Sequence, residues 1–197
     1  MGSGSMPQRE VDLAAARRAL QAFLRAVGAP VDEDPELQRT AETAARAFAE
    51  ELLEGYRMDP AEVLARCTRS EARSAVVLRA LPTTVVCPHH LLPAVGVVHV
   101  GYLPGGRVAG FGAISKLVRC YARRLVLQEE LVRQVAEALV EHLGARGAGC
   151  VAVLQPTCLT ARGPCAHGAK AVTSWFAGPE GDDPVLRAGL LNGPTGS

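Results

Sequence analysis

The chain has 197 residues, of which 48% are hydrophobic and 21% are charged. This composition is typical of a soluble globular protein with one sizeable core, and it argues against wholesale disorder. The formal net charge is +1 and only 4% of the residues are aromatic, so neither a broad basic surface nor a set of stacking platforms indicates a nucleic-acid partner. No apolar run reaches the roughly 18 residues of a bilayer span, so no membrane partner is expected.

The N-terminal region, residues 6–73, is predicted to be helical, after an opening MGSGS (residues 1–5) that is typical of a cloning scar. Residues 11–27 carry apolar side chains at spacings of three and four, which predicts an amphipathic helix. Asp34 followed by proline predicts the start of a second helix that ends near Gly55. The same pair of residue types at positions 59 and 60 predicts a short third helix.

The remainder, residues 74–197, alternates short β-branched runs with helical periodicity and completes a single domain. A hairpin turn is predicted at LPGGRV, two helices over 114–143 and a last helix near residue 183. This order indicates an α+β fold in which helices pack on one face of an antiparallel sheet. The predicted strands are 75–81, 83–87, 94–103, 106–114, 149–156, 157–163 and 169–177.

The segment VVCPHHLLPAVG, residues 85–96, carries the clearest chemical signal. Cys87 and His90 are separated by two residues, which allows a thiolate and an imidazole to meet on one cation, while His89 projects elsewhere. Zinc requires a third ligand, and Cys158 on a separate predicted strand is the best candidate. Burial of these side chains in an ordinary core is the alternative at this point. The sequence shows no signal peptide, so we expect a cytoplasmic protein, in which thiols near histidines more often bind metal than form disulfides.

Several segments together resemble the GTP cyclohydrolase I family. CPHHLLP, VVHVGYLPGGRVAG, ARRLVLQEEL, CLTARG and KAVTS follow the family's order and approximate spacing from about residue 36 to residue 178. The resemblance implies the tunnelling fold, or T-fold, in a ring-based homo-oligomer, commonly a decamer, with active sites at subunit interfaces. It implies a purine substrate: the family opens the imidazole ring of GTP at C8, releases formate and recloses the product as dihydroneopterin triphosphate.

The resemblance also implies roles for individual residues. Cys87, His90 and Cys158 match the family's Zn²⁺ ligands, and His89 matches its proton-transfer histidine, a task that suits an imidazole near pH 7. It implies that the Glu129 carboxylate binds the guanine edge, with the Gln128 amide beside it, and that Arg162 contacts phosphate. It places two further cations, Lys116 and Arg46, at phosphate-binding positions where the family has an arginine and a lysine.

The chain departs from the family pattern at positions that matter for catalysis. The family has a second catalytic histidine two residues before the distal zinc cysteine, where this chain has Pro156. His167 is near in sequence and is the alternative proton carrier, although a loop histidine without a catalytic role is the favoured interpretation. Phosphate-binding positions also differ. In an ungapped alignment the family's Ser-Lys pair falls on Gly112 and Ala113, whereas compensating gaps would restore Ser115 and Lys116. Thr43 replaces an arginine, and Pro88 stands where the family has glutamate.

Three functions are compatible with these features. The first is a zinc-dependent cyclohydrolase acting on a guanine nucleotide, either to completion or halted at a formylated ring-opened stage. The second is a hydrolase of the same fold acting on a purine or another heterocycle with fewer phosphates, in specialised metabolism. The third is a non-catalytic oligomeric binding protein with a structural zinc, which the three-ligand set disfavours because structural zinc sites usually have four protein ligands. The nitrile-reducing branch of the T-fold shares only architecture with this chain.

Overall fold

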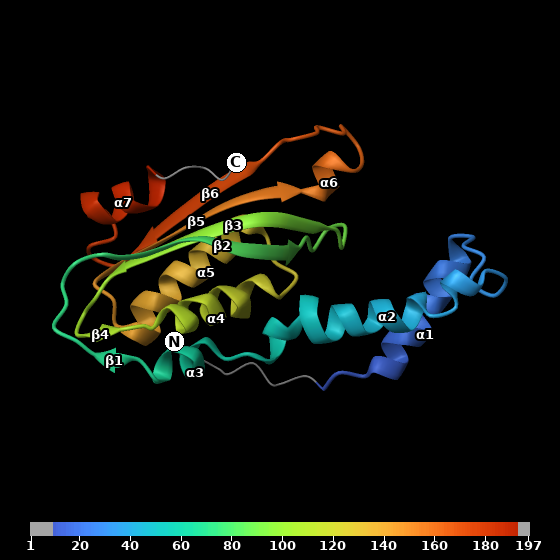
Figure 1. The fold of residues 1–197 in the computed structure, drawn as a ribbon, viewed down its shortest axis with the longest axis horizontal. Helices are drawn as coiled ribbons and strands as arrows, with labels where there is room; N and C mark the ends of the chain where they lie inside the picture. Colours follow the sequence, from blue (N-terminus) through green and yellow to red (C-terminus); the bar gives the residue numbers. More distant parts are fainter. Residues whose placement is uncertain (1–9, 193–197) are drawn as a thin grey trace.

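The computed structural model describes residues 10–192, so the predicted cloning scar at residues 1–5 lies outside the described residues. Its centre is a four-stranded antiparallel sheet in the order β2-β3-β5-β6. Two antiparallel helices, α4 and α5, lie along one face of this sheet (Figure 1). The predicted α+β architecture with paired helices on one face is therefore confirmed. The strands are β2 (Val76–Val86), β3 (Pro93–Leu103), β5 (Gly147–Pro156) and β6 (Ala171–Ala177), and the helices are α4 (Phe111–Ala122) and α5 (Gln128–Ala138).

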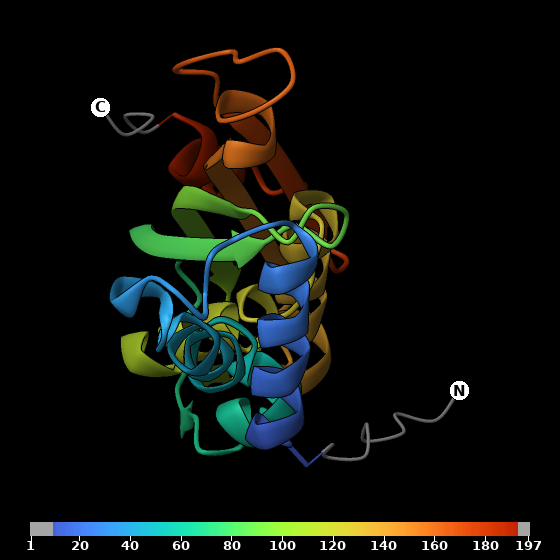
Figure 2. The ribbon, with the colours of Figure 1, turned by 90° about the vertical axis from the view of Figure 1, so that its right-hand side faces the viewer.

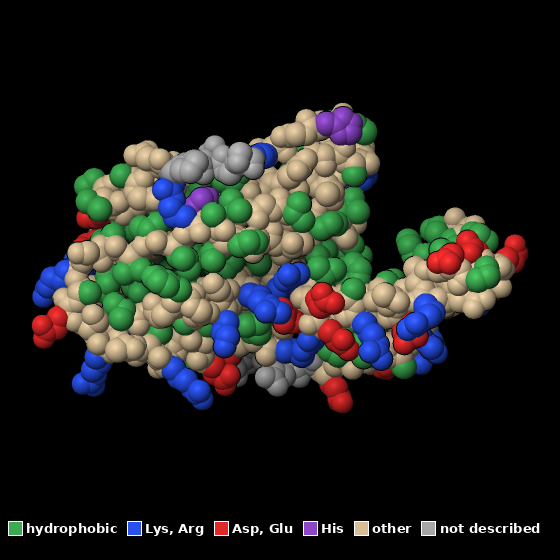
Figure 3. All heavy atoms as spheres, viewed as in Figure 1, with side chains coloured by type: hydrophobic (Ala, Val, Ile, Leu, Met, Phe, Trp, Pro, Cys, Tyr) green, Lys and Arg blue, Asp and Glu red, His purple; other side chains and the backbone are tan. Residues whose placement is uncertain are grey.

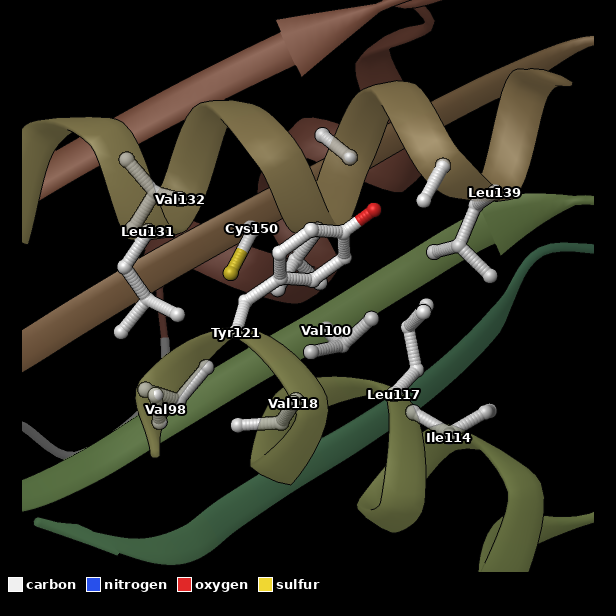
Figure 4. Close-up of a cluster of buried hydrophobic side chains, with 14 of the residues drawn as sticks. Val98, Val100, Ile114, Leu117, Val118, Tyr121, Leu131, Val132, Leu139 and Cys150 are labelled. Carbon is white, nitrogen blue, oxygen red and sulfur yellow. The ribbon is translucent and has the colours of Figure 1, made fainter. Parts of the chain in front are cut away.

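The hydrophobic core lies between the sheet and this helix pair (Figure 4). Alternate residues of β3 and the buried stripes of both helices meet there without solvent exposure, as Val98, Leu117 and Leu131 show. Burial of each such side chain contributes about 1.5–3 kcal/mol to folding. The helix pair ends in a π-helical turn, η4 (Leu139–Leu143), followed by Gly144 at φ 76°, the helix stop that the sequence predicts.

A short helix, α7 (Pro184–Leu191), covers part of the opposite face of the sheet (Figure 1). Asp183 caps its first turn by accepting hydrogen bonds from the amides of residues 185 and 186 at 2.9 Å. Leu186 and Leu190 are buried against strand glycines, and a Cβ atom at Gly101 would lie 2.9 Å from Leu186 Cδ1. Because these glycines have no side chains, the two strands leave room for a second, smaller core between the sheet and α7.

The first part of the N-terminal region, residues 13–52, forms an arm that projects beyond one end of the sheet, whereas the last helix of the region, at residues 60–65, packs against α4 (Figures 1 and 2). Asp34 and Asp59 cap the next two helical starts, as predicted. The single helix predicted from 34 to 55 is instead divided into 3-10, α and π segments. Its predicted end, Gly55, lies so close to α4 that a Cβ atom there would be 2.4 Å from a carbonyl oxygen of that helix. The segments are α1 (Leu13–Ala26), η1 (Pro35–Leu37), α2 (Thr40–Arg46), η2 (Ala47–Leu52), η3 (Glu54–Arg57) and α3 (Pro60–Ala65).

Two predicted strands are wrong. Residues 106–114 contain only the two-residue strand β4 (Arg107–Val108), which pairs with β1 (Thr68–Arg69) rather than with β3, so LPGGRV does not connect a hairpin. The rest of that segment begins α4. Residues 157–163 form one helical turn, α6 (Thr157–Thr160), and a loop. Short apolar runs fit strand and helix equally well by periodicity, and here the helical spacing of buried residues prevails.

Charged side chains of both signs lie on the surface of the molecule (Figure 3). Acidic and basic side chains are intermixed along the arm and the lower edge of the molecule (Figure 3). In the part of the chain from 10 to 192, no helix has both the length and the apolar character needed to cross a bilayer.

Replacing Tyr102 with phenylalanine is expected to lower the free energy of unfolding by about 1–3 kcal/mol. The Tyr102 side chain is fully buried, and its hydroxyl accepts a hydrogen bond from Ala109 N at 2.9 Å and donates one to Ala109 O. The change leaves both backbone groups without a partner in the core. Urea unfolding measures the loss. Tyr121→Phe is the matched control, because the Tyr121 hydroxyl makes no hydrogen bond within residues 10–192, and an equal loss in both variants would contradict the explanation.

The buried imidazole of His99 should make stability depend on pH. His99 is 4% exposed, and its Nδ1 accepts a hydrogen bond from Ala80 N at a bulge in β2 where Ala80 has φ 55°. Burial, with a smaller contribution from Arg79, lowers the pKa of His99. The folded protein therefore keeps this group neutral, while the unfolded chain binds a proton as the pH falls through about 6.5. The stabilisation is present above that pH and is lost below it.

We expect His99→Asn to flatten this dependence, because the amide oxygen of asparagine keeps an acceptor for Ala80 N without titrating. Urea unfolding at pH 7 and pH 5 would show a smaller decrease in the free energy of unfolding for the variant than for the unmodified protein. His167→Asn, a change in an exposed loop, should leave the decrease as it is. A decrease unaltered by His99→Asn would show that His99 does not control it.

Candidate metal centre

The turn between β2 and β3 brings Cys87 and His90 together. Leu91 N donates to Cys87 O and Cys87 N donates to Leu92 O, both at 2.9 Å, so the turn is closed at each end. Leu91 adopts φ 55°, a conformation that non-glycine residues adopt rarely and that often marks a functional site. As a result, the Cys87 Sγ and His90 Nδ1 atoms lie 3.8 Å apart.

Cys158 reaches the same place from the end of β5. The β3–β5 ladder runs to the pair Ala94↔Pro156, after which α6 begins. The ligand atoms of Cys87, His90 and Cys158 all lie within 4.8 Å of one another. The predicted convergence of the three side chains is thus present, although Cys158 lies on a helical turn and not on a strand as predicted.

This donor set fits zinc. Zn–S distances of about 2.3 Å and Zn–N distances of about 2.0–2.1 Å place tetrahedral ligand atoms roughly 3.5–3.8 Å apart, close to the observed Cys87–His90 separation. Two thiols and one imidazole form a three-residue set, and within residues 10–192 no further His, Cys, Asp or Glu side chain belongs to this group. Three protein ligands with one remaining position are typical of catalytic rather than structural zinc.

His89 lies beside the group without being part of it. Its ring is exposed and meets the His90 ring edge-on, with centroids 6.1 Å apart and an interplanar angle of 83°. The turn therefore places a second imidazole next to the one that belongs to the metal-ligand group. An imidazole is chemically suited to proton transfer near pH 7.

Glu129 and Gln128 begin α5 but have different surroundings. Glu129 is exposed and lines a hollow of about 500 Å³ between α5 and β6, a size that suits a small-molecule ligand. The Gln128 side chain turns to the sheet, where Nε2 donates to Ala152 O at 3.1 Å and to Ala171 O at 2.9 Å. Gln128 therefore ties β5 and β6 to the helix start that carries Glu129.

The three cationic candidates lie on separate elements. Arg162 is exposed in the loop after α6, Lys116 is exposed on α4, and Arg46 is exposed at the end of α2, 3.9 Å from Glu42. None of them forms a hydrogen bond or an ion pair with the metal-ligand group in the described part of the chain. A ligand that contacts all three would therefore need groups well apart from one another or a second copy of the chain.

The helix α4 carries both pairs of residues that the alternative alignments assign to the family's Ser-Lys positions. It is continuous from Phe111 to Ala122, and it buries Ile114 and Leu117 at helical spacing while Gly112, Ser115 and Lys116 are exposed.

Several residues that shape the metal-binding turn and the hollow beside Glu129 were not predicted from the sequence. The hydroxyl of Thr157 donates to Pro93 O at 2.6 Å, and the positive φ of Leu91 shapes the metal-binding turn. Trp175, the only tryptophan of the chain, is 43% exposed and lines the same hollow as Glu129. The hollow lies between a helix and a strand that are distant in sequence, so local patterns do not reveal it. The one sequence signal was the VTS segment of β6, which resembles the family and contributes to the lining.

Several known proteins are similar to this chain in sequence. A GTP cyclohydrolase 1 from Chromobacterium violaceum is 39% identical over 183 residues, which cover 93% of this chain and 88% of the relative. One from Dehalococcoides mccartyi is 36% identical, covering 92% and 96%, and one from Ralstonia nicotianae is 40% identical, covering 72% and 67%. Among solved structures, an archaeosine synthase QueF-like protein in the apo form shares 21% identity over 55% of this chain and 97% of its own, with a TM-score of 0.44.

The sequence profile of GTP cyclohydrolase I matches residues 16–193. That range contains the whole sheet, the helix pair, the β2–β3 turn and α6, and so every residue of the candidate metal centre. Because both the profile and close relatives span most of its length, this chain belongs to the GTP cyclohydrolase I family.

Proposed function

We propose that this protein is a zinc-dependent hydrolase that opens the imidazole ring of a guanine nucleotide at C8. The observation that carries the proposal is the convergence of the Cys87, His90 and Cys158 ligand atoms within 4.8 Å. When bound there, Zn²⁺ would supply Lewis-acid activation of water for attack on an electron-poor ring carbon. Membership of a family of enzymes with this activity supports the assignment.

The surrounding side chains have distinct roles in the proposed reaction. His89, exposed beside His90, would transfer protons to and from the opening ring. The Glu129 carboxylate would accept hydrogen bonds from the paired N–H donors of the guanine edge, and Gln128 would hold the start of α5 in place through its two strand contacts. Arg162, Lys116 and Arg46 would contact phosphate oxygens.

The separation of those cations supports an assembled site. Arg46 lies on the projecting arm and Lys116 on α4, so a homo-oligomer in which neighbouring copies face one another would bring such side chains to a shared ligand (Figure 1). We propose a cytoplasmic ring-shaped oligomer, a decamer if the family's usual assembly holds, with active sites at the subunit interfaces.

Two finer features define how this protein would differ from a complete cyclohydrolase. Pro156 has no proton to exchange, so the reaction would halt at the formylated, ring-opened stage. The cations available for a triphosphate are fewer than the family pattern provides, and each missing cation weakens binding of a multiply charged ligand. A purine substrate with fewer phosphates is therefore the second candidate.

Incubation with GTP, guanosine and guanine, monitored by ultraviolet absorbance and by a formate assay, tests these alternatives. Ring opening of GTP without formate is the expected result. Pterin fluorescence from GTP would contradict the halted reaction, and ring opening of guanosine alone would favour the substrate with fewer phosphates. Zinc bound without hydrolysis of any of the three would favour the non-catalytic binding protein and overturn the proposal.

A further inference from the structure

The metal-ligand group depends on a connection between two segments that are distant in sequence. Cys87 and His90 belong to a turn that is closed by its own backbone hydrogen bonds. Cys158 belongs to α6, a helical turn of four residues at the end of β5. The relative position of the two segments determines whether three ligands or only two can bind one ion.

The backbone ladder stops just before this connection. The last β3–β5 pair is Ala94↔Pro156, and Pro156 has no N–H to extend the ladder. The next residue, Thr157, donates from Oγ1 to Pro93 O at 2.6 Å. Within residues 10–192, this is the one hydrogen bond between α6 and the segment from Cys87 to Pro93.

The chemistry of this bond suits a positioning role. Thr157 directly precedes Cys158, and Pro93 directly follows the residue whose carbonyl closes the metal-binding turn. Because threonine is stiff at χ1, a hydroxyl bound at 2.6 Å restricts the backbone next to Cys158 as well as the side chain. We propose that Thr157 is a positioning residue that holds the Cys158 thiolate in place for binding with Cys87 and His90. This inference rests on the proposed zinc site and goes beyond it by assigning a residue that touches neither metal nor substrate.

Thr157→Val removes the hydroxyl and keeps the shape of the side chain. The zinc affinity of the full-length protein, measured by competition with a chromophoric chelator, should fall about tenfold, the lower end of the range for residues that orient metal ligands. Cobalt substitution should show a weaker thiolate-to-metal absorption, since the Cys158 sulfur is held less firmly. Thr157→Ser, which retains the hydroxyl, should recover most of the affinity.

Thr43→Val is the matched control, because Thr43 Oγ1 also donates to a backbone carbonyl, Arg39 O at 3.0 Å, but does so within α2. It should leave zinc affinity and the cobalt spectrum unchanged. The thermal shift on adding zinc reports the same affinity through linkage and should be smaller in Thr157→Val than in the control.

The outcomes separate this inference from the proposed function. If the unmodified protein binds no zinc, the proposed function itself fails. If it binds zinc and Thr157→Val binds it equally, with the same cobalt spectrum, the positioning role is wrong while the zinc site stands. A variant that melts at a lower temperature without metal but binds zinc with unchanged affinity would likewise overturn the inference, because it would show only a structural role.

Discussion

Replacing Cys158 with alanine is expected to lower zinc affinity by about two orders of magnitude or more and to abolish ring opening. The Cys158 sulfur is one of the three ligand atoms that converge within 4.8 Å, and its removal leaves the two from the β2–β3 turn. Two ligands do not hold zinc against water and chelators. Metal content after dialysis and the rate of absorbance change with GTP measure the two effects.

Cys165→Ala provides the control. Cys165 lies in the exposed loop after α6, seven positions from Cys158, and it is not one of the three converging residues. Its replacement should leave both metal content and rate unchanged. Retention of full zinc content by Cys158→Ala would show that the three side chains do not form the proposed metal site.

The fold was predictable from the sequence where periodicity and capping residues agree. The start of α3 after Asp59 and the stop of the helix pair at Gly144 follow from local chemistry, and the structure has them where they were predicted. The strand predicted over 106–114 failed because glycine-rich apolar runs carry no distinct period. Only the packing of Ile114 and Leu117 against the sheet makes that segment helical.

The residues of the candidate metal centre were predictable from the sequence, but the backbone conformation and contacts that position them were not. The spacing of Cys87 and His90 indicated a shared cation, Cys158 on a separate predicted strand was the best candidate for the third ligand, and the resemblance implied the same three residues. The sequence did not reveal the left-handed conformation of Leu91, which depends on how the β2–β3 turn closes. It also did not reveal the Thr157–Pro93 hydrogen bond, which depends on how β3 and β5 are aligned. Gln128 is a different case: the resemblance implied a substrate contact, and in the structure its side-chain amide donates to two strand carbonyls.

If the proposed reaction halts after ring opening, Pro156→His is expected to add the release of formate. Ring opening leaves the former C8 as a formyl group on nitrogen, and a second hydrolysis must break that bond while a proton passes to the departing nitrogen. Pro156 lies two residues before Cys158, is partly exposed, and has φ −80° and ψ 114°, a conformation open to histidine. The backbone therefore accepts an imidazole two residues from a metal-ligand cysteine without a change of conformation.

A positioned general acid or base contributes about 10²–10⁴-fold to a rate, so formate release by Pro156→His should exceed that of the unmodified protein by at least about tenfold even if the geometry is imperfect. The rate of ring opening should change much less, because His89 remains. Pro156→Gln is the matched control: it removes the proline ring and adds a polar side chain that cannot exchange a proton at neutral pH, and it should release no additional formate. Formate equal to ring-opened product in the unmodified protein would show that Pro156 does not halt the reaction, since the second hydrolysis would then proceed without a proton carrier at this position.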